Sequence, residues 1–147
     1  MIIGSISENK NVEKRISITP DIAKKYISSG FQILIETAYG NHLGISDDDF
    51  LKVGCKIEKK EDILVQSDVI LQLDLLEEKN LEFLKEEKIL IGSFNSIQNF
   101  EKINKLKLKK TAIFSLELLP RITRAQSMDI LSSQANLAGY KAVIESF

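Results

Sequence analysis

Side chains able to make directed hydrogen bonds gather in one stretch near the end of the sequence, RITRAQSMDILSSQANLAGY, residues 121–140. Apolar and small residues recur there and just beyond at steps of three and four, which is the spacing of one face of a helix. These residues are Met128, Leu131, Ala135, Ala138 and Ala142. A solvated helix face normally carries Lys and Glu, but this stretch has amides, hydroxyls, Arg and Asp instead. The pattern therefore needs a chemical explanation.

The polar groups of this stretch suit the binding of a ligand better than acid–base catalysis. We predict a helix from about Thr123 to Phe147, with Arg121 in the lead-in and Gln126 one turn inward. Four further polar residues would then lie along or beside one line of turns: Asp129, Ser132, Ser133 and Asn136. Together such groups can hold a planar ligand that bears an amide. The residues alone leave open a second interpretation, in which they only tie neighbouring loops together.

Arg15, in EKRISITP, is a second candidate for a ligand contact. It lies between the first predicted strand and a well-capped helix, where sheets of the predicted kind place their ligands. A guanidinium there could bind a carboxylate or a phosphate with two parallel hydrogen bonds. It could equally pair with a nearby acid such as Glu13 or Glu36, and the sequence does not decide between the two.

Three other groups favour structural interpretations. The triplet 47–49 is all Asp, but Ser46 before it predicts a helix cap with an acidic first turn rather than a metal site. His42, in GNHLGI, has no evident partner and is predicted to be a surface loop residue. Cys55 follows Gly54 and is predicted to be a small core residue.

Composition excludes several classes of function. The chain has 147 residues, a formal net charge of −1 and mixed acids and bases, so a broad basic face for nucleic acid is not expected. The lysine-rich stretch 102–110 is predicted to be a solvated helix end that leads into a strand. One cysteine and one histidine provide neither a disulfide nor a zinc cluster, and a reducing compartment is the simple inference. No apolar run approaches the ~18 residues of a membrane span.

Short runs of Ile, Leu and Val alternate with helical patterns along the chain. The predicted strands are Met1–Ile6, Gln32–Glu36, Asp68–Leu73, Lys88–Ser93 and Thr111–Ser115. Helix signals fill the gaps: Thr19 and Pro20 begin one helix, Ser46 begins another, and residues 77–86 and 97–107 supply two more. This βαβ rhythm predicts an α/β fold with a doubly wound, mainly parallel, flavodoxin-like or Rossmann-like sheet.

Two features set limits on this fold. The seven glycines never form G-x-G-x-x-G or a P-loop, so the chain has no usual cradle for a pyrophosphate. The last predicted helix ends at KAVIESF without Gly, Pro or a basic last turn, although a helix usually has such a stop signal. We therefore expect the chain to be the front part of a larger protein.

The sequence resembles a known family. PRITRAQSMDILSSQANLAGYKAVIE, residues 120–145, is similar to the NAD(H)-binding component, domain I, of the proton-translocating nicotinamide nucleotide transhydrogenases, at the start of their alpha subunit. EKRISITP and GFQILIETAYG match as well, so the resemblance covers essentially the whole chain. The related alanine dehydrogenases share the fold and the early Arg-containing segment, but not the Arg-Ala-Gln-Ser stretch.

The resemblance implies a specific function and set of partners. Family members bind NADH between this first domain and a Rossmann domain that follows it. Hydride passes to NADP⁺ on a separate component, coupled to proton movement through a membrane component. By resemblance, Arg121, Gln126, Asp129 and Ser132 bind NAD(H) at the nicotinamide ring, and the first three of them are the candidate catalytic groups. The resemblance also implies a homodimer, and a cytoplasmic location at the inner membrane through partner subunits.

Two departures from the family pattern keep alternatives open. Residues 1–147 would form only an incomplete first domain, with 121–147 as an inter-domain helix and the Rossmann domain absent, so the chain alone should bind NADH weakly. Gln72, in ILQLD, stands where related sequences usually carry Lys, and LIGSFNS lacks the His that alanine dehydrogenases use. The alternatives are an alanine-dehydrogenase-like oxidoreductase domain and a non-catalytic regulatory or assembly module.

Overall fold

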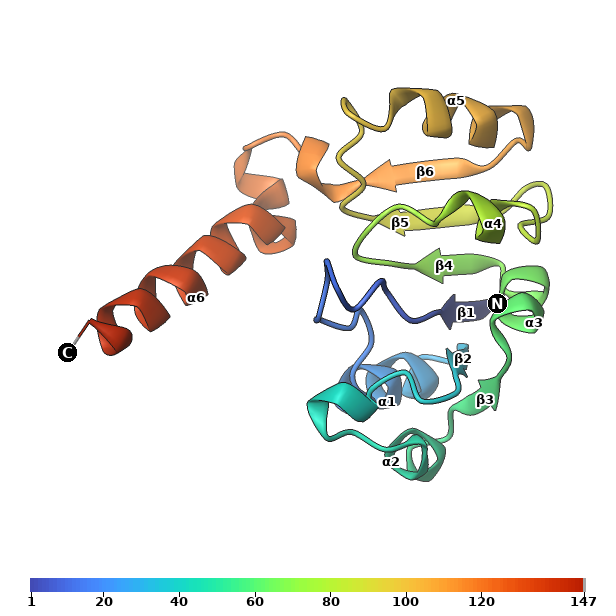
Figure 1. Cartoon of the computed structure of the whole chain (residues 1–147), viewed down its shortest axis with the longest axis horizontal. Helices are drawn as coiled ribbons and strands as arrows, with labels where there is room; N and C mark the ends of the chain where they lie inside the picture. The colour runs from blue at the N-terminus through green and yellow to red at the C-terminus, as the bar shows by residue number, and fades with distance from the viewer. Residues whose placement is uncertain (147) are drawn as a thin grey trace.

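The computed structural model describes residues 1–146 as a six-stranded parallel sheet flanked by helices (Figure 1). The strand order is β3-β2-β1-β4-β5-β6, and every neighbouring pair is parallel. The strands are β1 Ile2–Ser5, β2 Gln32–Glu36, β3 Lys56–Glu58, β4 Val69–Leu71, β5 Ile89–Gly92 and β6 Ala112–Ser115. The chain winds outward from β1 to β3 and then from β4 to β6, which confirms the predicted doubly wound α/β fold.

Helices connect these strands, and three short 3₁₀ helices lie in the loops. The α-helices are α1 Pro20–Ser28, α2 Asp47–Lys52, α3 Lys60–Gln66, α4 Glu78–Leu81, α5 Phe100–Leu108 and α6 Ile130–Glu145. The 3₁₀ helices are η1 Asn41–Leu43, η2 Leu116–Leu118 and η3 Thr123–Met128. The predicted caps are present, since Thr19 accepts a hydrogen bond from the backbone of Ile22 and Ser46 forms a capping box with Asp49.

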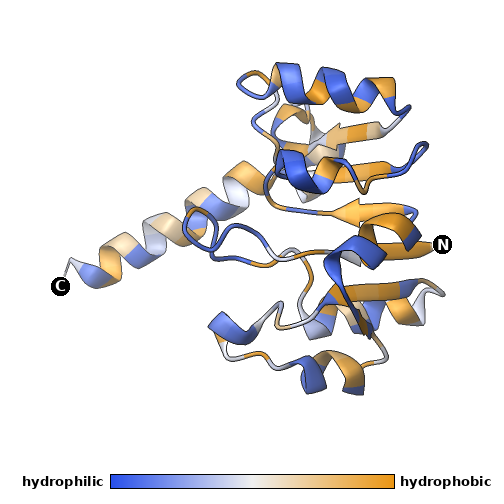
Figure 2. Cartoon of the chain, turned by 45° about the vertical axis from the view of Figure 1, so that its right-hand side comes forward, coloured by the Kyte–Doolittle hydropathy of each residue, from blue (hydrophilic) through white to orange (hydrophobic). Residues whose placement is uncertain are grey.

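Two hydrophobic cores lie on opposite faces of the sheet. Side chains alternate along β2, so that Leu34 joins the core under α3, α4 and α5 while Ile33 and Ile35 join the core under α1 and α2. Neighbouring residues of β4 divide in the same way, with Ile70 on one face and Val69 on the other. Figure 2 shows these strands as a hydrophobic layer. Burial on both faces explains why the strands read as continuous apolar runs.

One strand and one helix of the structure have no predicted counterpart. β3 and α3 occupy residues 56–66, for which we predicted no element. β3 is a three-residue edge strand that pairs only with β2, and it carries Lys56 and Glu58. A short charged edge strand has no hydrophobic run by which to detect it.

The predicted continuous helix from Thr123 to the chain end is wrong. The chain forms η3, turns at Asp129, and only then begins α6. Asp129 has φ −75° and ψ 92°, outside the helical region, and its carboxylate caps α6 by accepting a hydrogen bond from the backbone N–H of Ser132. The predicted end at Phe147 lies outside the described residues. The helix predicted over residues 77–86 is also shorter in the structure, where α4 spans only Glu78–Leu81.

Candidate functional site

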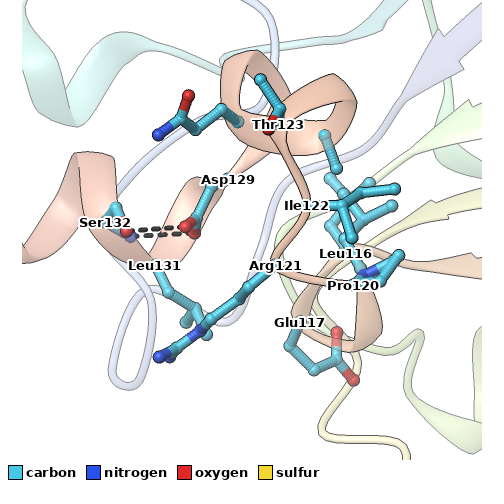
Figure 3. A pocket seen from close by; sticks show the side chains of 12 residues that line it. Leu116, Glu117, Pro120, Arg121, Ile122, Thr123, Asp129, Leu131 and Ser132 are labelled. Atoms are coloured by element: carbon cyan, nitrogen blue, oxygen red, sulfur yellow. Dashed lines mark hydrogen bonds between the residues drawn. The ribbon is translucent and has the colours of Figure 1, made fainter.

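The cavity that carries the predicted site lies beyond the carboxyl end of β6. The chain leaves the sheet there through η2, passes Pro120, and folds back through η3 into the start of α6 (Figure 1). These segments enclose a cavity of about 460 Å³ (Figure 3). Its lining residues are Leu116, Glu117, Leu119, Pro120, Arg121, Ile122, Thr123, Ala125, Gln126, Asp129, Leu131 and Ser132.

The structure brings the four predicted site residues together. Arg121, Gln126, Asp129 and Ser132 all line this one cavity. They come from three local elements: the turn after Pro120, η3, and the start of α6. η3 ends at Met128, and Asp129 then redirects the chain. The polar groups therefore line one cavity instead of spreading along one straight helix. Ser133 and Asn136, which we aligned with them on a continuous helix, do not line the cavity.

Asp129 and Ser132 form a hydrogen-bonded pair at the cavity wall (Figure 3). Ser132 donates from its backbone N–H to Oδ1 at 3.0 Å and from its hydroxyl to Oδ2 at 2.6 Å. The hydroxyl hydrogen bond, helped by the backbone one, lowers the pKa of Asp129. Asp129 is therefore ionised at neutral pH and is no proton donor. Since the Ser132 hydroxyl gives its proton to Asp129, its oxygen lone pairs remain free to accept a bond from a ligand.

Glu117 is a cavity residue that the sequence analysis missed. Its carboxylate accepts hydrogen bonds from the backbone N–H of Phe94 at 3.1 Å and of Ser96 at 2.9 Å, and from the Ser96 hydroxyl at 2.8 Å. Burial opposes ionisation, but these hydrogen bonds outweigh it and lower the pKa of Glu117. The carboxylate thus ties the loop after β5 to the cavity wall. No local motif marks this role, because its partners are about twenty residues away in sequence.

Gln72 lies apart from this cavity, in the middle of the sheet where the strand order reverses. It is buried at 3% exposure. Its oxygen accepts hydrogen bonds from the backbone N–H of Ile6 at 2.9 Å and the hydroxyl of Ser5 at 3.2 Å, and its amide nitrogen donates to Glu8 at 3.1 Å. The polar atoms of the Gln72 side chain therefore hydrogen-bond to other groups of the domain.

Burial, offset in part by backbone hydrogen bonds from Leu73 and Asp74, raises the pKa of Glu8 to about 7.

Arg15 takes the second of its two predicted roles, with Glu13 rather than Glu36 as its partner. Its Nε lies 2.9 Å from Oε1 of Glu13 and its Nη2 lies 2.6 Å from Oε2. A third nitrogen, Nη1, donates to Oε1 of Gln134 on α6 at 2.8 Å. Arg15 does not line the cavity.

The remaining candidates have the structural roles that we favoured. Asp49 belongs to the capping box, and Asp47 accepts hydrogen bonds from the backbone N–H of Ala38. His42 is exposed, and its Nε2 lies 2.7 Å from the carbonyl oxygen of Lys14. Cys55 is buried, which raises the pKa of its thiol to about 11. Over residues 1–146, no three His, Cys, Asp or Glu side chains cluster as metal ligands.

The same part of the chain contains no helix with the length and apolar character needed to cross a membrane. The lysine-rich stretch 102–110 lies on α5 and in the turn before β6, as expected. Lys105 pairs with Glu78 at 2.7 Å, and Lys109 donates to the carbonyl oxygens of Leu81 and Leu84. Lys105 and Lys109 therefore bind groups of the domain itself.

The structure is a doubly wound α/β domain with a cavity outside the carboxyl end of its edge strand β6. The chain belongs to the alanine dehydrogenase/PNT N-terminal domain family, whose model matches residues 4–138. This match confirms the resemblance drawn from residues 120–145 and the earlier segments.

Similar proteins agree with this assignment. The chain is 37% identical to the first portion of the NAD(P) transhydrogenase alpha subunit of Rickettsia prowazekii, over 99% of this chain and 39% of the relative. It is 35% identical to the NAD(P) transhydrogenase alpha subunit of Haemophilus influenzae, over 99% of this chain and 28% of the relative. The chain therefore spans about two-fifths or less of the curated relatives that it matches over its full length.

Solved structures agree on the fold. The transhydrogenase from Sinorhizobium meliloti superposes with a TM-score of 0.92 and 34% identity, over 99% of this chain and 43% of that chain. An L-alanine dehydrogenase superposes with a TM-score of 0.75 and 19% identity over 80% of this chain and 32% of that chain, which shows a shared fold alone. The ligand roles of Arg121, Gln126, Asp129 and Ser132 stay predictions.

Proposed function

We propose that this domain forms one side of the NAD(H) site of a proton-translocating transhydrogenase, in which hydride passes from NADH to NADP⁺ on another component. The observation that carries the proposal is the convergence of Arg121, Gln126, Asp129 and Ser132 on one cavity. The family match and the full-length similarity to transhydrogenase alpha subunits support it.

The cavity residues would act by positioning the nicotinamide ring. The Arg121 guanidinium would donate to the ring's carboxamide oxygen, and the Gln126 amide could donate and accept. The Ser132 hydroxyl donates its proton to Asp129, so its oxygen would be available to accept from the carboxamide N–H. These contacts would fix the rotation of the ring, and the apolar side chains of Leu116, Leu119 and Ile122 complete the cavity wall.

No general base is needed for this proposed role. The hydride would come from the bound cofactor, and direct transfer between two nicotinamides depends on the distance and alignment that these residues would set. Asp129 is ionised and hydrogen-bonded, which suits an orienting group and does not suit an acid. Arg121 and Gln126 would therefore be catalytic in the sense that they hold the reacting ring, and Asp129 would contribute by orienting Ser132.

The proposal includes components beyond this chain. A Rossmann domain would bind the diphosphate and the adenosine, an NADP(H)-binding component would receive the hydride, and a membrane component would conduct the proton. We also propose that the domain works as a homodimer on the cytoplasmic side of the inner membrane, attached through these partners.

Reduced nicotinamide mononucleotide is the probe that isolates the proposed contact, because it has the ring but lacks the diphosphate and the adenosine. Titrated into the ¹⁵N-labelled chain, it should shift the amide signals of residues 121–132 with a dissociation constant on the order of 1 mM. Gln126→Ala and Asp129→Asn should each weaken binding by about tenfold. Arg124→Ala is the matched control, since Arg124 is exposed and does not line the cavity.

Unchanged binding in both cavity variants would contradict the proposed roles. Activity separates the two alternatives: an alanine-dehydrogenase-like domain should support pyruvate reduction, and an assembly module should bind a partner while leaving the fluorescence of the reduced nicotinamide unchanged. The transhydrogenase proposal expects hydride transfer to an NADP⁺ analogue in the full assembly, reduced in both variants.

A further inference from the structure

The connection between β1 and α1, residues 6–19, loops out beyond the carboxyl end of β1 before it reaches α1 (Figure 1), and one of its residues, Arg15, contacts α6. We call this segment the strap. Its first anchor is Glu8, whose Oε1 accepts hydrogen bonds from the backbone N–H of Leu73 at 2.6 Å and from Nε2 of Gln72 at 3.1 Å. These bonds attach the strap to the carboxyl end of β4.

Two further hydrogen bonds hold the second half of the strap against residues that follow β2. The carbonyl oxygen of Lys14 accepts a hydrogen bond from His42 Nε2 at 2.7 Å. The phenol oxygen of Tyr39, a buried residue after β2, accepts from the backbone N–H of Ser17 at 2.9 Å. The strap is therefore held on both sides of Arg15, at Lys14 by the exposed His42 and at Ser17 by the buried Tyr39.

Arg15 is itself oriented by its neighbour in the strap. Its Nε and Nη2 both donate to the Glu13 carboxylate, as in a two-pronged guanidinium–carboxylate pair. The backbone N–H of Arg15 donates to the same carboxylate at 2.8 Å. Because the guanidinium is planar, this pair fixes the direction of Nη1, which lies 2.8 Å from Oε1 of Gln134.

The helix that Arg15 reaches has few other attachments. Every residue from Leu131 to Ser146 is exposed. Within residues 1–146, the bond from Arg15 is the only side-chain hydrogen bond that joins α6 to a segment outside residues 129–146. The direction of α6 relative to the sheet therefore depends on the turn at Asp129, on the packing of the start of α6 against η2, and on this hydrogen bond from Arg15.

We propose that Arg15 is a positioning residue that holds α6 at a fixed angle to the sheet and so sets the shape of the cavity that Asp129 and Ser132 line. Gln134 is on α6 two residues after Ser132, and neither Arg15 nor Gln134 lines the cavity. Arg15 thus acts through the helix and not on a ligand. The consequence for ligand binding rests on the function proposed above; the mechanical contact does not.

Hydrogen exchange in the full chain tests the mechanical contact without a ligand. In Arg15→Ala and in Gln134→Ala, the backbone amides of residues 133–140 should exchange about fivefold faster than in the wild type. The double variant should exchange no faster than either single variant, because one contact is lost in all three. Amides of β1 and β4 should keep their wild-type rates, which separates a local effect from a loss of overall stability.

Two further variants sharpen the test. Gln134→Glu should retain or increase protection of α6, because the new carboxylate can still accept from Arg15; this effect should vanish when Arg15 is Ala. Lys10→Ala is the matched control, since it removes an exposed cation of the same strap and should leave α6 unchanged. Wild-type exchange in Arg15→Ala, or effects of the two single variants that simply add, would overturn the proposal.

Binding of reduced nicotinamide mononucleotide then separates this proposal from the proposed function. If Arg15→Ala speeds exchange in α6 and weakens binding by about fivefold, both stand. If exchange changes while the wild type shows no binding, the contact stands and the proposed function fails. If the wild type binds and Arg15→Ala changes neither property, Arg15 has no positioning role and the proposed function is untouched.

Discussion

The central sheet buries its apolar side chains, whereas α6 exposes its own. On the sheet, β2, β1 and β4 place their apolar side chains in two cores, and Leu34, Ile35 and Ile70 are almost completely buried. On α6, apolar side chains such as Leu137 and Tyr140 are more than half exposed. The polar residues ahead of α6, in contrast, cap the helix and line the cavity. The sheet contains the buried cores, and the chain after β6 contains the candidate site.

The largest difference in the free energy of unfolding is expected when one aromatic ring is removed from each region. Phe94 is fully buried in the core beneath α5, so Phe94→Ala should lower the free energy of unfolding by about 3–5 kcal/mol. Tyr140→Ala on α6 should change it by less than about 0.5 kcal/mol, because its ring is 70% exposed. Urea denaturation of both variants measures the contrast. A comparable loss in both would show that α6 is packed against the domain in solution.

Glycines offer a second and smaller contrast between the same regions. A Cβ at Gly92, at the end of β5, would lie 2.1 Å from the backbone oxygen of Gln72, so Gly92→Ala should cost about 2–3 kcal/mol. A Cβ at Gly139 meets nothing within 4 Å, so Gly139→Ala should stabilise the exposed helix by about 0.5–1 kcal/mol. Opposite signs in thermal and urea unfolding are the expected outcome. Destabilisation by Gly139→Ala would mean that this face of α6 is covered.

Burial also decides which strands of the sheet could be predicted from the sequence. Buried strands have a recognisable apolar pattern, and the predicted strand Gln32–Glu36 coincides with β2. β3 was missed because an edge strand of three residues, two of them charged, needs no apolar pattern. Pairing with β2 is a tertiary effect that a window of the sequence does not contain.

The candidate site was predictable where it is local. Arg121, Gln126, Asp129 and Ser132 lie within twelve consecutive positions, so any compact arrangement keeps them near one another. The turn at Asp129 was missed because helical spacing of apolar residues continues across it, although an Asp three residues before Ser132 is a recognisable cap signal. Glu117 was not predictable, since its role depends on a bond to the loop after β5.

A titration of Glu8 tests the contact between the strap and the sheet. Burial raises the pKa of Glu8 to about 7 from an ordinary value of 4.5, with Asp74 and Glu13 adding repulsion. Between these pH values the folded state holds a proton that the unfolded state has lost. Wild-type stability should therefore fall as pH rises from about 4.5 to about 7, and level off above that.

Glu8→Gln should remove this fall, because an amide does not titrate and its oxygen can still accept from Leu73 and Gln72. The variant should gain about 1–2 kcal/mol over the wild type between pH 4 and pH 8, less than the full shift implies because the carboxyl is only partly buried. Glu86→Gln, at an exposed position, should keep the wild-type slope. A slope that survives in Glu8→Gln would mean that Glu8 is solvated, and hence that the strap lifts from β4 while the sheet beneath it stays folded.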